Sequence, residues 1–161
     1  MAVMQSRDTR TFVAGESLAA AQFKFVTLES DGEVDLADSA GENCVGVCIN
    51  DPAAGEAATV VMSGKVMVTA GGTTAAGAAV ATDASGDAVT ASAGNIVMGY
   101  ATEAGVDGQV IAIELIQGGN AAAGRPSQPS SGSFRRPMSA VVMGSPASRS
   151  THGRGSDSPE S

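Results

Sequence analysis

The sequence has few of the residues from which catalytic and ligand sites are usually built. Its 161 residues include one histidine, two cysteines, one tyrosine and no tryptophan, and aromatic residues make up only 3% of the chain. No apolar run approaches the ~20 residues that a membrane-spanning helix needs, and the N-terminus shows no hydrophobic signal segment. We therefore expect no membrane partner, and we expect the two cysteines to be free thiols rather than a disulfide.

Large apolar side chains are also scarce. Hydrophobic residues make up 43% of the chain, but many of them are alanine and valine, and there are 21 glycines. Small side chains bury little area at roughly 25 cal/mol per Å², while glycine raises the entropy cost of folding. We expect a domain that is marginally stable alone and gains stability by association.

Basic residues are few in the first three quarters of the chain. Residues 1–119 hold four basic residues, Arg7, Arg10, Lys24 and Lys65, against fifteen acidic ones, whereas residues 120–161 hold five arginines against two acidic residues. Nucleic-acid binding needs a basic surface, so the acidic body argues against a direct nucleic-acid partner.

Short β-prone segments separated by Gly, Asp and Asn recur along the chain. They lie at residues 23–28, 33–36, 44–49, 57–62, 66–68, 95–101 and 109–116. Residues 23–36 read as one hairpin around Asp31-Gly32, and Ser63-Gly64-Lys65 reads as the tight turn of a second, central hairpin that ends at Gly71-Gly72. The pattern predicts an all-β fold, a small barrel or sandwich of short antiparallel strands.

Three regions differ in composition. Residues 1–14 read as an extended N-terminal arm in which residues 11–13 can pair as an edge strand, and residues 15–119 form the β domain. Residues 120–161 form an irregular tail rich in Ser, Pro, Gly and Arg, which we expect to be disordered in isolation. Its one apolar island, residues 138–143, is able to add as a strand to another sheet.

Four acidic residues have the spacing of a calcium loop. Asp31, Glu33, Asp35 and Glu42 occupy positions one, three, five and twelve, but Leu36 stands at position six, where that loop needs glycine. The alternation of acidic and apolar residues favours a solvated strand face beside a turn. We expect no metal site and no cofactor.

The cysteines and the histidine also favour structural readings. In a strand, Cys44 and Cys48 share a face but lie ~13 Å apart, which is too far for both to bind one zinc ion, so buried small hydrophobes are the better interpretation. His152 lies in the tail, away from any nucleophile in the folded body. We expect no catalytic residues and no enzyme.

An ordered series of short motifs resembles the head-decoration (capsid cement) proteins of tailed bacteriophages. The resemblance covers about residues 10–117, and each motif is weak alone but the order and spacing are specific. The motifs are Gly46-Val47 and residues 63–68, 75–80, 83–86, 96–101 and 108–115.

This resemblance implies a non-enzymatic virion protein, made in the host cytoplasm and placed on the outer surface of the capsid. Such proteins are compact β domains, often homotrimers, that bridge neighbouring major capsid proteins and stabilise the shell. The family supplies no catalytic residues to transfer.

The contacts expected with other subunits lie at the two ends of the chain. We expect the N-terminal arm to contact the capsid through Arg7, Arg10, Thr11 and Phe12, by main-chain pairing along a capsid strand. The tail offers a second inter-subunit contact, through Arg135, Arg136, Val141, Val142 and Met143. An alternative function is a particle-displayed binding module for host-surface glycans, although Tyr100 alone is a poor sugar-stacking platform.

Overall fold

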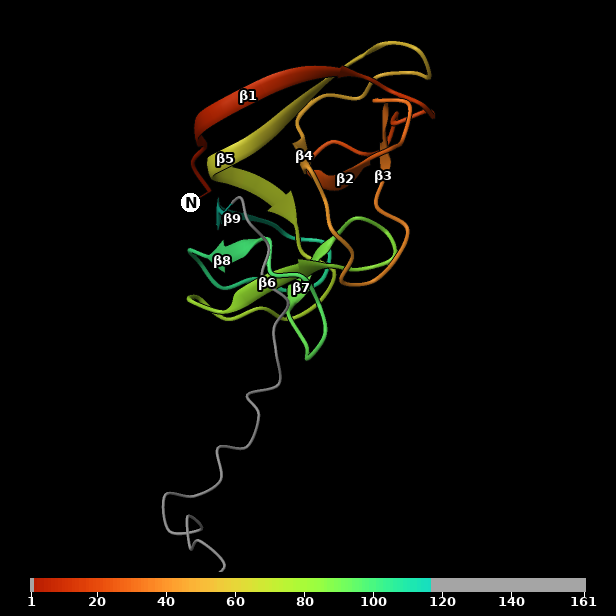
Figure 1. The fold of residues 1–161 in the computed structure, drawn as a ribbon. Helices are drawn as coiled ribbons and strands as arrows, with labels where there is room; N and C mark the ends of the chain where they lie inside the picture. Colours follow the sequence, from red (N-terminus) through yellow and green to blue (C-terminus); the bar gives the residue numbers. More distant parts are fainter. Residues whose placement is uncertain (1, 117–161) are drawn as a thin grey trace, which may run out of the picture. The chain divides into compact units, whose positions relative to one another are not determined.

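The structure is a computed structural model that describes residues 2–116, and these residues form nine β-strands (Figure 1). The strands are β1 (Gln5–Val13), β2 (Lys24–Leu28), β3 (Val34–Leu36), β4 (Gly46–Cys48), β5 (Ala57–Thr69), β6 (Ala79–Thr82), β7 (Ala88–Thr90), β8 (Gly99–Ala101) and β9 (Val110–Leu115). They pair antiparallel in one sheet that curls into a half-barrel, which confirms the predicted all-β class. None of the described residues belongs to a helix with the length and hydropathy that a membrane crossing requires.

The long strand β5 organises the sheet. The strand order is β3-β2-β4-β5-β9-β8-β6-β7, and β1 pairs with the remaining edge of β5 (Figure 1). The predicted hairpin over residues 23–36 is confirmed, because β2 and β3 pair through the turn at Asp31-Gly32. The strand predicted at residues 109–116 is confirmed as β9.

The predicted hairpin turn at Ser63-Gly64-Lys65 is wrong, because β5 runs through these residues as one strand of 13 residues. Gly64 does adopt a positive φ of 96°, but it serves a β-bulge instead of a turn. A Cβ there would lie 2.7 Å from both the Arg7 nitrogen and the Gln5 oxygen, so glycine lets β1 pass close to β5.

Two compensating bulges set the register of β1 on β5. Ser6 pairs with Gly64 and Asp8 with Ser63, so Arg7 is an extra residue on β1. The next pair joins Thr9 to Val61, which leaves Met62 as an extra residue on β5. The original register then resumes and continues to Val13.

Each face of the central strands packs into its own hydrophobic core. The larger core gathers Phe25, Val47, Val61, Val66, Val68, Val80, Ile111, Ile113 and Leu115 with smaller residues. The smaller core gathers Ala14, Leu18, Ala21, Val26, Val34, Cys48, Ala58 and Val60. Alanine and valine dominate both, as the composition indicated.

The cysteines are free and buried, which confirms their interpretation as small hydrophobes. The expectation that they share one face is wrong: Cys44 packs in the larger core and Cys48 in the smaller one. The reason is that β4 begins only at Gly46, so Cys44 precedes the regular strand. Burial raises the pKa of the Cys44 thiol to about 12, which disfavours the thiolate that metal binding requires.

Four turns share one local design. A glycine with positive φ is followed by a residue whose side-chain oxygen accepts the N–H three positions earlier, at 2.8–3.2 Å. The backbone N–H of the same residue donates to the carbonyl oxygen of the residue three positions earlier. The four closing residues are Glu42, Glu56, Asn95 and Gln109.

Candidate interaction surface

The edge of the sheet at β3 is closed by the chain itself. Gly15 donates its N–H to the Val34 carbonyl at 3.1 Å, and the Glu16 carboxylate accepts the Leu36 N–H at 3.0 Å. Glu16 therefore satisfies a donor that would otherwise be offered to another strand.

The edge at β7 is protected in a similar way. Ala70 forms a β-bridge with Ala88, and Gly71 donates its N–H to the Ala88 carbonyl at 2.9 Å. The segment that follows β5 thus lies along a strand that is itself only three residues long. Short, covered edges of this kind are poor templates for an added strand.

The outer edge of β1 is different. Strand β1 is nine residues long, and seven of these are exposed. It pairs with β5 on one side, and no strand among residues 2–116 pairs with its other side (Figure 1). The sheet therefore leaves one long edge open in the described part of the chain.

One hydrogen bond identifies which groups face this open edge. Ala14 donates its N–H to Glu56 at 2.9 Å in the same register as the β1–β5 ladder, so it marks a hydrogen-bonded position. Antiparallel ladders alternate, and the main-chain groups of Thr9, Thr11 and Val13 therefore point away from β5. Each of these residues presents one donor and one acceptor outward.

The structure divides the four residues predicted to make the capsid contact. Arg7, Arg10 and Thr11 are exposed on β1, whereas Phe12 is half-buried and packs against the smaller core. Phe12 thus anchors β1 to its own domain. The segment expected as an arm is a strand of the sheet from residue 5 onward, longer than the pairing expected at residues 11–13.

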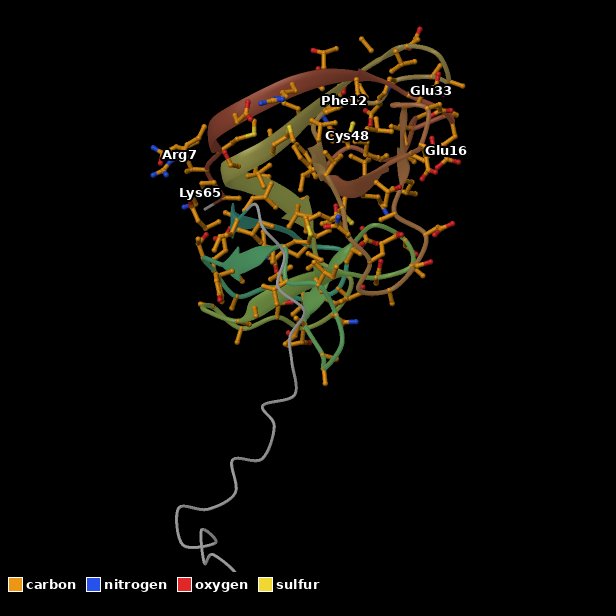
Figure 2. All side chains as sticks on the ribbon, viewed as in Figure 1. Arg7, Phe12, Glu16, Glu33, Cys48 and Lys65 are labelled. Atoms are coloured by element: carbon orange, nitrogen blue, oxygen red, sulfur yellow. The ribbon has the colours of Figure 1, made fainter. Side chains whose placement is uncertain are left out.

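Sequence reasoning missed the contribution of Lys65. It pairs with Gln5 in the ladder, which places it beside the start of β1, and Figure 2 shows Arg7 and Lys65 close together at that end. Only the pairing of two segments almost 60 residues apart brings these side chains together, so no local motif could reveal it.

The remaining cation of the described body is committed elsewhere. Lys24 forms an ion pair with Asp87 at 2.9 Å and donates a hydrogen bond to the Ser85 carbonyl at 3.0 Å. These contacts tie β2 to the turn between β6 and β7. Arg7, Arg10 and Lys65, which we call the basic cluster, are then the cations left near the open edge.

Acidic residues gather at the opposite end of β1. Figure 2 shows Glu16 and Glu33 together beyond its last residue, where Ala14 bridges to Val34. The pKa of Asp35 is raised there, first by burial and then by the carboxylates of Glu16 and Asp31. The two ends of β1 thus lie in surroundings of opposite charge.

Two of the four residues with calcium-loop spacing accept local main-chain hydrogen bonds. Asp31 accepts the N–H of Glu33, and Glu42 accepts those of Asp38 and Ser39. No group of three or more His, Cys, Asp or Glu side chains among residues 2–116 has a geometry that could hold a metal ion.

The aromatic side chains of the described range do not gather at one place on the surface. Tyr100 is exposed on β8, and Phe12, Phe23 and Phe25, the other aromatic residues of the described range, are half-buried or buried. A platform of stacked aromatic rings is therefore not formed by these residues. The tail residues Arg135, Arg136, Val141, Val142 and Met143, and also His152, lie outside the described part of the chain.

Comparison with known proteins adds a family and a fold. The family model for phage cement proteins matches residues 4–115. The crystal structure of the N base of head fiber gp8.5 from bacteriophage phi29 is similar, with a TM-score of 0.57 and 21% sequence identity, over 70% of this chain and 97% of that chain. The second similarity concerns the fold alone. No curated protein matches the chain.

Proposed function

The chain belongs to the phage cement protein family, and from this premise we propose that it stabilises a phage head by bridging neighbouring major capsid proteins. Family membership gives it a capsid-associated structural role on the outer surface of the virion. Bridging, and the residues that perform it, are the parts that we propose.

The open edge of β1 carries the proposal. A strand that exposes seven of nine residues and one complete edge is costly to maintain unless another chain uses it, because such edges promote aggregation. We assign Arg7, Arg10 and Thr11 to the capsid contact, and Phe12 to holding β1 in place for it.

Association with other copies is the second part of the proposal. The cores consist mainly of alanine and valine, so contacts between subunits add stability that the isolated domain lacks. We propose a homotrimer, in which the tail residues Arg135, Arg136, Val141, Val142 and Met143 contact a neighbouring subunit. Many equivalent contacts on one lattice then act together by avidity.

Heads assembled without this protein provide the test. The purified protein is mixed with such heads, and its occupancy and the temperature of head rupture are measured. We expect saturable binding and a higher rupture temperature. Binding that leaves the rupture temperature unchanged would contradict the stabilising role, and a protein that does not bind heads would contradict the proposal as a whole.

A further inference from the structure

We propose that the open edge of β1 receives an extended, acidic segment of the shell as an added β-strand. This inference rests on the proposed function and specifies the chemistry of the partner. The β1 edge has free main-chain groups and exposed cations beside it, and the other edges of the sheet are closed.

The main chain provides the attachment. Thr9, Thr11 and Val13 turn three donors and three acceptors outward, and the register from Thr9 to Val13 is regular. Five residues in this conformation span about 17 Å, which is the length of an ordinary strand. The segment contains no proline, so every outward N–H is available.

Side chains flank this edge without covering it. Thr9, Thr11 and Val13 are exposed, and Thr and Val are favoured in strands because they pack well against a neighbouring strand. The irregular part of β1 is confined to the bulge at Arg7. The bulge therefore does not disturb the regular half of β1, and it places Arg7 as an extra residue on the N-terminal side of that half.

Charge selects the partner. Arg7 forms no ion pair within the described residues, and the pair that Arg10 forms with Asp8 is long and exposed, with 3.3 Å between Nε and Oδ2. Lys65 is the weaker contributor, because it lies near the Glu103 carboxylate and opposite Glu114 in the β5–β9 ladder. Exposed pairs of this kind contribute little, so another carboxylate can replace Asp8. Exposed cations lie on the N-terminal half of β1, whereas acidic residues lie beyond its C-terminal end. An acidic partner segment is therefore attracted beside Arg7 and Arg10 and repelled by the rest of the acidic body.

A second copy of this chain fits the edge less well. Symmetric pairing of two β1 edges requires a two-fold axis and closes a dimer, whereas the assembly proposed above is a homotrimer. A segment of the shell protein therefore fits the proposed assembly better than a second copy does.

Substitutions at Thr11 test the main-chain part on undecorated heads. Thr11→Pro removes one outward N–H and leaves the bonds to β5 in place, whereas Thr11→Val keeps that N–H. We expect Thr11→Pro to weaken head binding about tenfold and Thr11→Val to bind like the wild type. Thermal unfolding of each free variant establishes that it is folded.

Substitutions at Arg10 test the charge. Arg10→Glu should weaken binding about tenfold or more, Arg10→Lys should bind nearly as the wild type, and wild-type affinity should fall as salt is raised. Arg7→Lys places a primary amine at the edge. A zero-length carbodiimide then forms an amide bond between this amine and any carboxylate that contacts it. We expect its mass-mapped product to be an acidic segment of the shell protein.

The outcomes separate this inference from the proposed function. If the wild type binds heads and the Thr11→Pro and Arg10→Glu variants bind equally well, the inference is overturned and the proposed function is left intact. A coupling product joining Arg7→Lys only to another copy of this chain would show that a second copy occupies the edge, and would also overturn it. Absence of wild-type binding would overturn both.

Discussion

The backbone nitrogen of Arg7 lies so close to Gly64 that a side chain at position 64 would clash with it. A Cβ on Gly64 would stand 2.7 Å from the Arg7 nitrogen, and the φ of 96° is itself unfavourable for any residue with a side chain. Glycine at position 64 therefore allows β1 to lie against β5 at the bulge, where Arg7 is the extra, exposed residue.

Gly64→Ala should destabilise the domain by about 2–4 kcal/mol, because it combines a left-handed conformation with a backbone clash. Gly72→Ala is the matched control, since no atom lies within 4 Å of its Cβ and its φ is not in the left-handed region. Urea unfolding of both variants measures the difference. Equal stability of the two variants would show that the bulge is not where the structure places it.

Two strand glycines permit close contact between neighbouring strands. A Cβ on Gly46 would clash with the Val61 carbonyl oxygen, and one on Gly99 would clash with the Glu114 carbonyl oxygen. Since main-chain atoms cannot move aside without breaking the ladder, either alanine variant should lose about 2–4 kcal/mol. Chemical denaturation against the Gly72→Ala control tests this, and a loss below about 0.5 kcal/mol would contradict the packing.

Breaking the turn that ends at Gln109 should lower the free energy of unfolding by a smaller amount. Its side-chain oxygen accepts the Val106 N–H at 3.2 Å, so Gln109→Ala should cost about 0.5–1.5 kcal/mol. Asp107→Ala, in the same turn, removes an exposed side chain and should change stability by less than about 0.5 kcal/mol. Thermal unfolding of the pair is the measurement, and the reverse order of the two effects would refute the proposed turn design.

Cys44 should make stability fall at alkaline pH. Burial raises its pKa from the ordinary value of 9.0 to about 12, so the unfolded thiol ionises while the folded thiol stays protonated. The stabilisation is complete below pH 9 and is lost as the pH rises from 9 toward 12. The free energy of unfolding, measured from pH 8 to 10.5, should decline less steeply in Cys44→Ala than in the wild type. Parallel declines would contradict the burial of this thiol.

Local chemistry made most of the fold predictable. The turn at Asp31-Gly32 combines residues whose backbone preferences act over four or five positions, and β9 alternates in Ile111, Ile113 and Leu115, all buried. Ala112 departs from that alternation. It is buried because Thr102 and Glu103 hydrogen-bond to its main chain from the segment after β8.

Contacts between distant segments account for what the sequence could not predict. A positive-φ glycine serves a turn or a bulge equally well, and only the presence of β1 decides for a bulge at Gly64. The polar stretch at residues 5–10 has no apolar alternation, so its strand depends on pairing with β5. The basic cluster depends on that same pairing, which places Lys65 beside Arg7.

A reconstruction of heads decorated with this protein tests the central claim most directly. The account predicts that the β1 edge lies in the contact with the shell, that a strand of the major capsid protein runs along Thr9 to Val13, and that each decorating unit touches more than one capsid protein. A reconstruction in which β1 faces solvent while another surface meets the shell would contradict it.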